Sequence, residues 1–314
     1  MSCLSVSSYS RREQFGPLTF DFVDPEGNDV HVEFPYPKLL SLPEFPAWAR
    51  DAFGVDAIEI VGFQFVGTDD PELDQFATAQ GTAGIRLIDV VIDGGDLAEP
   101  DAGKRAADVE FVKRWIERFA AMGSRFVRVN PGSPFGRHHS DTPATRLTDT
   151  LGELGEFAKE HGTQLLVEDH GGRSSDPLWM KPLLDSVGRG ICGLLLDLGN
   201  FGAVTGPVMP LLFGGENGQD PAEVGAELDR TSTYDAIEAL AAYAELVSLK
   251  AHYVTDDGIA GPVDLVRAIG ILADRRYTGP LSVEYEGTGG DPWANSARIL
   301  DLVRAAPVSL AATE

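Results

Sequence analysis

The sequence has few of the features that would place it in a familiar class. It contains only two cysteines, Cys3 and Cys192, and neither belongs to a CxxC pair. A disulfide framework or a cysteine-rich zinc site is therefore excluded, and we expect two free thiols in a reducing, cytoplasmic compartment. No stretch approaches the roughly 18 consecutive apolar residues of a membrane span. Residues 1–14 lack a basic start followed by a long apolar run, so we expect no signal peptide.

Basic residues are also scarce. The 314 residues include 25 Lys and Arg against 49 Asp and Glu, which gives a formal net charge of -24. A surface with this charge repels nucleic-acid phosphate and anionic membranes. We therefore expect neither of them as a partner, and the charge favours a small molecule instead.

Three common catalytic signatures are absent. The first apolar run is not followed by a GxGxxG turn, which argues against dinucleotide binding on a Rossmann fold. The chain also has no GxSxG nucleophile elbow and no Walker A loop, which argues against a serine hydrolase and a P-loop nucleotidase.

The chain does contain short apolar runs that alternate with helical patterns for most of its length. The runs are rich in Val, Ile and Leu, which is typical of parallel strands buried on both faces. Eight β/α units in one chain predict a (β/α)8 TIM barrel, here a single domain over residues 1–314, with a doubly wound open sheet as the main alternative. The predicted strands are residues 3–9, 57–65, 85–92, 125–130, 163–169, 193–198, 246–253 and 280–286.

Two segments depart from this repeat. Residues 18–34 alternate apolar and polar side chains around a DPEGND turn, which predicts an inserted β-hairpin after the first strand. Residues 201–233, after the sixth strand, are rich in Gly and Pro and predict a long loop. Asp-Pro pairs at Asp70, Asp176 and Asp291 predict helix starts, with Asp as the N-cap.

Acidic and imidazole side chains end four successive predicted strands: Glu168, Asp197, His252 and Glu284. The carboxyl ends of parallel neighbours meet at one rim, where barrel enzymes keep their chemistry. Taken singly, each residue is better explained as a helix cap, an ion-pair partner or a structural histidine. Together they predict an oxygen and nitrogen site for a divalent cation.

Strand parity adds further candidates at the same rim. Side chains two residues apart share a face, so His170 lies with Glu168, Lys250 with His252, and Glu286 with Glu284. Asp169 should point the other way. Asn130 and Asn200, at the ends of the fourth and sixth predicted strands, are candidates for binding substrate hydroxyls. Turn chemistry explains Asn200 equally well.

The motifs RVNPG, VEDHGG, LDLGNF, SLKAHY and LSVEYEG resemble the sugar phosphate isomerase/epimerase superfamily, also known as the xylose isomerase-like or endonuclease-IV-like TIM barrels. The resemblance implies one divalent metal ion, most often Mn²⁺ and otherwise Mg²⁺, Co²⁺ or Zn²⁺. Its ligands would be Glu168, Asp197, His252 and Glu284, with Glu286 as the alternative for the last position.

The chain departs from the ketose epimerases of that superfamily at two points. They carry a His three residues after the sixth-strand Asp, where this chain has Asn200. Their His-x-Lys order on the seventh strand is inverted here to Lys250-Ala251-His252. The combination of VEDHGG, DLGNF and KAH resembles a subgroup that includes the α subunits of C-glycoside deglycosylases. This resemblance implies His170 as a base and a small β subunit as partner.

Three functions follow as expectations. The first is a metal-dependent isomerase or epimerase of a carbohydrate or polyol, acting through an enediolate. His170 or Glu168 would remove the proton, Lys250 or Glu284 would return it, and Asn130, Asn200 and Glu286 would bind substrate. The second is a lyase that cleaves 3-oxo-C-glycosides. The third is a non-catalytic sugar-binding subunit. We expect a homo-oligomer, or a hetero-oligomer with the β subunit.

Overall fold

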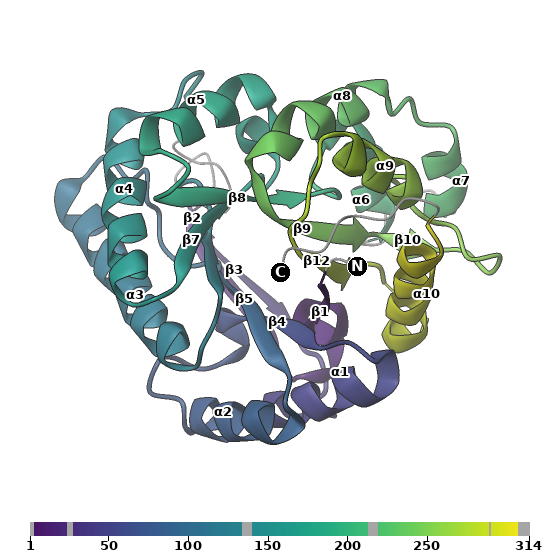
Figure 1. Cartoon of the computed structure of the whole chain (residues 1–314), viewed down its shortest axis with the longest axis horizontal. Coiled ribbons are helices and arrows are strands. Elements are labelled where there is room, and N and C mark those ends of the chain that lie inside the picture. Colours follow the sequence, from purple (N-terminus) through teal and green to yellow (C-terminus); the bar gives the residue numbers. More distant parts are fainter. Residues whose placement is uncertain (1–2, 24–27, 134–139, 213–218, 289, 307–314) are drawn as a thin grey trace.

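A closed barrel of eight parallel strands lies at the centre of the molecule, in the order β1-β12-β9-β8-β7-β6-β5-β4 (Figure 1). The computed structural model describes residues 3–23, 28–133, 140–212, 219–288 and 290–306. Every barrel strand coincides with a predicted apolar run, so the predicted TIM barrel is confirmed. The strands are β1 (Leu4–Ser7), β4 (Ala57–Val61), β5 (Arg86–Ile92), β6 (Phe126–Val129), β7 (Gln164–Glu168), β8 (Cys192–Asp197), β9 (Ala244–Ala251) and β12 (Leu281–Tyr285).

Helices surround the barrel as an outer ring (Figure 1). The predicted N-caps Asp70, Asp176 and Asp291 each accept a hydrogen bond from the backbone N–H two residues later, at 2.8 to 2.9 Å. These bonds satisfy a donor that the helix itself leaves unpaired. The helices of the ring are α1 (Phe45–Phe53), α2 (Pro71–Ala83), α3 (Ala102–Ala121), α4 (Thr145–Glu160), α5 (Pro177–Val187), α8 (Thr231–Leu240), α9 (Leu265–Asp274) and α10 (Pro292–Ala305).

The barrel interior is apolar at one level and polar at the next. Its apolar floor is a cluster separate from the larger core between the sheet and the helices. The floor takes one side chain from each of six strands: Ala57, Ile88, Phe126, Leu166, Leu195 and Leu246. Two residues further along β6 and β7, the inward positions are Arg128 and Glu168, both buried. The barrel is therefore a packed core below and a charged mouth above.

Both insertions are present, and one of them differs from the prediction. The hairpin is formed by β2 (Leu18–Val23) and β3 (Asp29–Phe34), and its turn lies outside the described residues. The segment predicted as a long loop contains α6 (Gly202–Leu212) and α7 (Pro221–Ala226). Its Gly and Pro content predicted a loop, but Val204, Val208 and Leu212 lie four residues apart and are buried on one helix face.

Short elements complete the chain. A two-stranded sheet of β10 (Tyr253–Val254) and β11 (Ala260–Gly261) follows β9. Cys3 and Cys192 are free, as predicted. No helix within the described ranges is long and apolar enough to cross a membrane. The 3-10 helices are η1 (Ser8–Gln14), η2 (Leu42–Glu44), η3 (Gly62–Gln64), η4 (Gly172–Ser175) and η5 (Ala241–Tyr243).

Candidate active site

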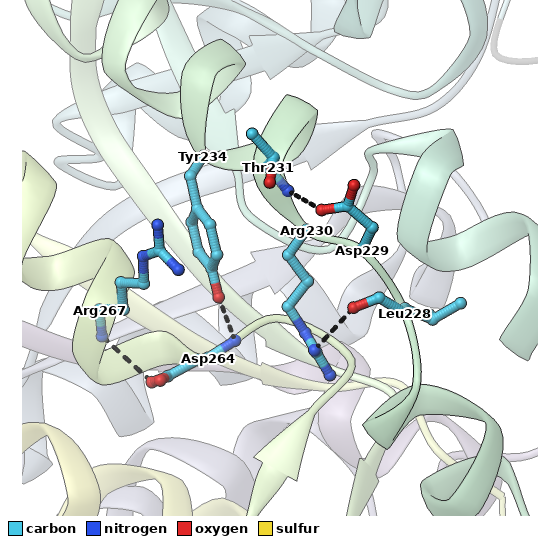
Figure 2. Close-up of a pocket in the computed structure, with 7 residues that line it drawn as sticks. All are labelled: Leu228, Asp229, Arg230, Thr231, Tyr234, Asp264 and Arg267. Carbon is cyan, nitrogen blue, oxygen red and sulfur yellow. Dashed lines mark hydrogen bonds between the residues drawn. The ribbon is translucent and has the colours of Figure 1, made fainter.

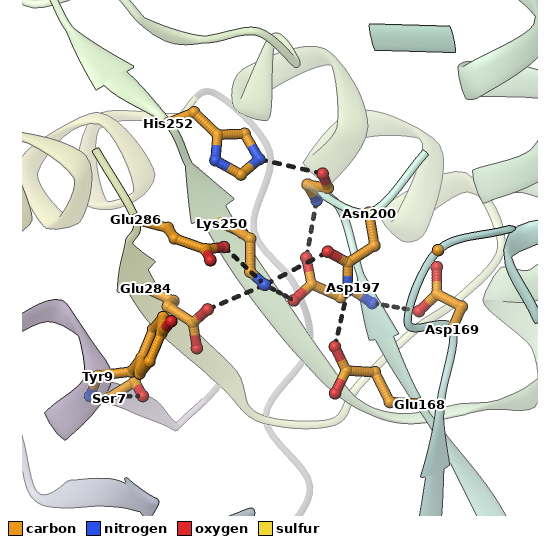
Figure 3. A network of polar contacts seen from close by, with 12 residues as sticks. Ser7, Tyr9, Glu168, Asp169, Asp197, Asn200, Lys250, His252, Glu284 and Glu286 are labelled. Atoms are coloured by element: carbon orange, nitrogen blue, oxygen red, sulfur yellow. Dashed lines mark hydrogen bonds and ion pairs between the residues drawn. The ribbon is translucent and has the colours of Figure 1, made fainter. Parts of the chain in front are cut away.

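The ammonium group of Lys250 lies among three carboxylates at the barrel mouth (Figure 3). Its Nζ is 3.0 Å from Asp197 Oδ2, 3.0 Å from Glu284 Oε1 and 3.1 Å from Glu286 Oε2. Only 7% of the Lys250 side chain is exposed. The structure thus brings Asp197, Glu284 and Glu286 together as predicted, around the nitrogen of a lysine.

Strand register explains this arrangement. Glu284 on β12 is the direct register partner of Lys250 on β9, and Asp197 on β8 pairs with Ser248, two residues before Lys250. Inward side chains on these neighbouring strands therefore end at similar heights. The segment that follows Glu284 is held by Arg12 of η1, whose guanidinium donates to the carbonyl oxygens of Glu286 and Gly287 at 3.3 and 3.0 Å.

Burial and the lysine charge act in opposite directions on these groups. Burial on its own would lower the pKa of Lys250, but the adjacent carboxylates outweigh it and hold this pKa well above its usual range. Burial raises the pKa of Glu284, and Lys250 only partly opposes this effect. At Glu286 burial is outweighed by Lys250, His252 and Arg12, which lower its pKa to about 2. Glu284 is therefore the more basic carboxylate of the two.

Glu168 lies in a second polar group, centred on Arg128. The Arg128 guanidinium forms ion pairs with Glu168 and with Asp93, and it also donates to Asn130 Oδ1 at 3.2 Å. Asn130 Nδ2 donates to Asp93 Oδ1 at 2.9 Å, so this predicted substrate-binding residue orients a neighbouring carboxylate. Sequence analysis missed Arg128, although an arginine within a buried apolar strand was a readable signal.

Asn200 connects the two groups. Its Nδ2 donates to Glu168 Oε1 at 2.7 Å, and its Oδ1 accepts from Lys250 Nζ at 3.3 Å (Figure 3). Asp169 points out of the mouth, as strand parity predicted, and its Oδ1 accepts from the Asp197 backbone N–H at 2.6 Å. Asn200 therefore fixes the distance between Glu168 and the lysine.

His252 does not join the carboxylates. Its Nε2 lies 3.1 Å from the carbonyl oxygen of Gly199, while its Nδ1 is buried and has no hydrogen-bond partner. Burial lowers the pKa of His252 below its usual value, so the imidazole is neutral at pH 7. Two of the four predicted metal ligands therefore have other partners. His252 is bound to the backbone carbonyl of Gly199, between β8 and α6, and Glu168 is paired with Arg128.

These contacts do not fit a divalent cation. The described residues include no group of three or more His, Cys, Asp or Glu side chains placed to hold a metal ion. The carboxylate oxygens of Asp197, Glu284 and Glu286 that would coordinate an ion lie around the Lys250 nitrogen instead. The metal and its identity stay a prediction that rests on the resemblance.

A large cavity opens at this end of the barrel. Its volume is about 1820 Å³, and its charged lining includes Arg128, His170, Lys250, Glu284 and Glu286. Glu168, Asp197 and His252 are not among the lining residues. The hairpin and several aromatic side chains supply walls: Tyr9, Phe15, Phe34, Phe63, Phe65, Phe111 and Trp115. Sequence analysis missed Tyr9, which η1 places beside the carboxylates.

Two further carboxyl groups lie near this site, and neither of them forms an ion pair with Lys250. Glu59 on β4 and Asp89 on β5 are register partners, and both are fully buried. Burial raises the pKa of Asp89 to about 7, with Arg128 opposing it. Burial and the neighbouring Asp89 hold the pKa of Glu59 well above its usual value. Asp89 therefore takes up a proton near neutral pH, and Glu59 binds its proton more tightly than an ordinary glutamate does.

A second pocket, of about 270 Å³, lies apart from the mouth between α8 and α9 (Figure 2). Its arginines are already engaged. Arg230 donates to the carbonyl oxygens of Pro262 and Leu228 at 2.6 and 3.0 Å, and the Arg267 guanidinium lies 3.9 Å from the centre of the Tyr234 ring. These contacts tie the rim together and offer no reactive group.

Comparison with known proteins adds a family. The model of the xylose isomerase-like TIM barrel family matches residues 46–304. No curated protein matches the chain in sequence. An L-ribulose 3-epimerase structure is similar at 16% identity and a TM-score of 0.63, with 98% of this chain and 94% of that chain covered. D-psicose 3-epimerase from Clostridium cellulolyticum H10 is similar at 13% identity and a TM-score of 0.66, with 98% of this chain and 100% of that chain covered. 3-keto-D-glucoside 4-epimerase from E. coli is similar at 14% identity and a TM-score of 0.58, with 84% of this chain and 94% of that chain covered. At these identities, the structural likeness shows the fold alone.

Proposed function

Because the chain belongs to the xylose isomerase-like TIM barrel family, we propose that it is a carbohydrate isomerase or epimerase that abstracts a proton next to a carbonyl. One observation carries this proposal. The carboxylate of Glu284 and the ammonium of Lys250 lie 3.0 Å apart, and both line the cavity. A base beside a fixed cation is what enolisation requires, because negative charge develops on the carbonyl oxygen as the proton leaves.

The proposed step balances without an oxidant or reductant. Glu284 takes the proton from the carbon next to the carbonyl, and the electrons of that C–H bond form the carbon–carbon double bond. The carbonyl electrons move onto oxygen, which the Lys250 ammonium stabilises. Isomerisation results when the proton returns to the former carbonyl carbon and the proton of the adjacent hydroxyl moves to the former carbonyl oxygen, so that the hydroxyl oxygen becomes the new carbonyl. Return of the proton to the opposite face of the original carbon gives epimerisation. His170, which also lines the cavity, supplies a second group for proton transfer.

The similar structures support sugars as the substrate class. Their names describe epimerases of ribulose, psicose and a 3-keto-glucoside. In each name the substrate carries a carbonyl that acidifies a neighbouring C–H bond. A small keto-sugar also agrees with the acidic surface, which would repel polyanions.

Deuterium exchange tests this function directly. The protein is incubated in D2O with a panel of keto- and aldo-sugars, and the incorporation of deuterium at carbon is followed by NMR and mass spectrometry. Exchange is expected with at least one sugar, whatever product accumulates. Glu284→Gln should abolish the exchange, because it removes the base and keeps the shape of the side chain.

Glu153→Gln is the matched control. Glu153 is a surface glutamate on α4 that also lies beside a lysine, at 2.7 Å from Lys113 Nζ, and its replacement should leave exchange unchanged. Sugar binding without any exchange, in the wild-type protein, would overturn the enzymatic proposal and favour a non-catalytic sugar-binding subunit.

A second candidate function is favoured by the cavity volume. About 1820 Å³ exceeds the roughly 300–1,000 Å³ of ordinary small-molecule pockets. This leaves room for an aglycone beside the sugar, as a lyase of 3-oxo-C-glycosides would need. The same enolate would then re-form the carbonyl, form a double bond between the α and β carbons, and break the bond to the aglycone, which leaves with the electron pair and takes up a proton. Release of a free aglycone from a 3-oxo-C-glucoside, with or without a co-purifying small β subunit from the native host, tests this alternative.

A further inference from the structure

We infer that the Lys250 ammonium takes the place of a metal ion, so that the enolate is stabilised by a cation that belongs to the chain. The inference rests on the proposed function and concerns the same site. It departs from the metal dependence that the resemblance implies, because two of the four implied ligands, Asp197 and Glu284, are held at this nitrogen together with Glu286.

The first support is the set of oxygen atoms around Nζ. Three carboxylate oxygens from the ends of two strands, β8 and β12, lie 3.0 to 3.1 Å away, and Asn200 Oδ1 lies 3.3 Å away. A lysine has three N–H donors, and three carboxylates are within reach to accept them. Oxygen ligands drawn from separate strands onto one point form a cation site, and the cation here is an ammonium group.

The second support is the close packing of the lysine stem against Gly199. A Cβ atom added to Gly199 would lie 2.6 Å from Lys250 Cγ and 2.7 Å from both Lys250 Cβ and Cδ. Real Cβ contacts of this length do not occur, so the backbone after β8 leaves space for this side chain only because residue 199 is glycine. The lysine is therefore held along its length, and its position does not depend on the carboxylates alone.

The third support is the position of the imidazole of His252, which follows the end of β9. The register level of Glu284 is taken by Lys250, whereas His252 lies one step further and is bound to the Gly199 carbonyl. A divalent cation on the same oxygens would sit about 2.0 to 2.6 Å from each of them. It would then be almost in contact with the ammonium, and the two positive charges would repel each other strongly in a buried site.

This arrangement also couples removal of the proton by Glu284 to stabilisation of the substrate oxygen by Lys250. When Glu284 accepts the proton from carbon it loses its negative charge and becomes a weaker hydrogen-bond acceptor. The Lys250 N–H that it held becomes available to the substrate oxygen, on which charge has just developed. The lysine acts as a charge and a donor. It does not act as a nucleophile, because a fully protonated nitrogen has no lone pair with which to form an imine.

Metal binding tests the inference independently of activity. Wild-type protein is treated with EDTA, dialysed against MnCl2 and analysed for bound manganese. The wild type is expected to retain far less than one ion per chain. Lys250→Met should bind Mn²⁺ at least roughly tenfold more tightly than the wild type, because three carboxylates lose their cation. Lys113→Met is the matched control: this surface lysine also lies between two glutamates, at 3.0 and 2.7 Å, and its loss should create no metal site.

Removal of Lys250 leaves three buried carboxylates unpaired, so the variant is expected to be unstable. Thermal denaturation with and without MnCl2 covers that case, because Mn²⁺ should stabilise Lys250→Met and leave the wild type unchanged. One tightly bound Mn²⁺ per wild-type chain, lost in Asp197→Asn, would overturn the inference.

Deuterium exchange by the EDTA-treated wild type separates this inference from the proposed function. Exchange that persists without metal supports both. Exchange that appears only after addition of Mn²⁺ refutes the inference and preserves the function. No exchange under either condition refutes the function, and the binding measurement then decides the inference alone. Borohydride should trap no sugar on Lys250, since no imine forms.

Discussion

Arg128 on β6 and Glu168 on β7 form a buried ion pair, with 6% and 2% of their side chains exposed. Asp93 lies against the same guanidinium, which makes Arg128 the cation of this half of the mouth. Burying charges is costly, and a pair that loses one member leaves the other uncompensated. The pair therefore fixes the position of the Glu168 side chain, which cannot move away without leaving a buried charge unpaired.

Arg128→Met should destabilise the protein by about 3–5 kcal/mol, because Glu168 and Asp93 lose their partner in a buried site. The measurement is the free energy of unfolding from urea denaturation. Adding Glu168→Gln to this variant should recover part of the loss, since it removes one unpaired charge. Arg275→Met, which breaks an exposed pair with Glu238, should cost no more than about 1 kcal/mol. Equal losses in both single variants would contradict the prediction.

The pH dependence of stability should reveal Asp89. Its pKa is about 7 in the folded protein, mainly because of burial, against roughly 3.9 in an unfolded chain. Between these two values the folded state binds more protons than the unfolded state, so stability falls as pH rises from about 4 to about 7. Above that range the penalty is constant, and it amounts to at most about 4 kcal/mol.

Asp89→Asn removes this group and should flatten the decline. Thermal denaturation from pH 4.5 to pH 8.5 checks the outcome: the variant should gain stability over the wild type as pH rises, with the largest gain at the alkaline end. Glu59 retains its own raised pKa, so some decline should remain. Parallel curves for the two proteins would show that Asp89 does not titrate in this range.

His170 is expected to matter for turnover and not for folding. It lines the cavity two residues after Glu168. His170→Asn should reduce deuterium exchange by about 10²–10⁴-fold, which is the usual contribution of a positioned acid or base. The melting temperature should stay close to that of the wild type. His161→Asn, on the surface at the end of α4, is the control that should alter neither quantity. An unchanged exchange rate in His170→Asn would exclude His170 from proton transfer and leave Glu284 as the proposed base.

The barrel and the gathering of carboxylates could be predicted from the sequence because both depend on periodicity. Apolar runs identify buried strands, and parity along β7 correctly separated Glu168 from Asp169. The hairpin was predicted for the same reason. By contrast, the helix α6 was hidden by Pro207 and Pro210, which lie inside it.

The partners of each charge could not be predicted in this way. Lys250 and Arg128 have long side chains whose ends can reach several neighbours, and only the packing around their stems selects one. Parity placed Lys250 and His252 on one face, yet the register pairs Lys250 with Glu284 and leaves His252 against backbone. A sequence pattern predicts at which strand end a residue lies. It does not predict whether Lys250 or His252 lies among the carboxylates at the barrel mouth.

Gly199→Ala should displace Lys250. The backbone of Gly199 does not adopt a positive φ, so the cost of a side chain there arises from contact alone. The new methyl group would overlap the Lys250 stem, and relief requires a shift of the lysine or of the β8 backbone. We expect a stability loss of about 1–3 kcal/mol, as for other overpacked sites, and a deuterium exchange rate reduced about tenfold or more.

A double-mutant cycle shows whether the lysine is the cause. In a Lys250→Gly background the overlapping Cβ, Cγ and Cδ atoms are all absent, so Gly199→Ala should cost almost nothing, and the two substitutions should be strongly non-additive. Gly152→Ala is the matched control: no atom lies within 4 Å of a Cβ at this helical glycine, and alanine should stabilise α4 by about 1 kcal/mol. Additive losses at Gly199 and Lys250 would mean that the glycine does not hold the lysine in place, and the ammonium would then owe its position to the carboxylates alone.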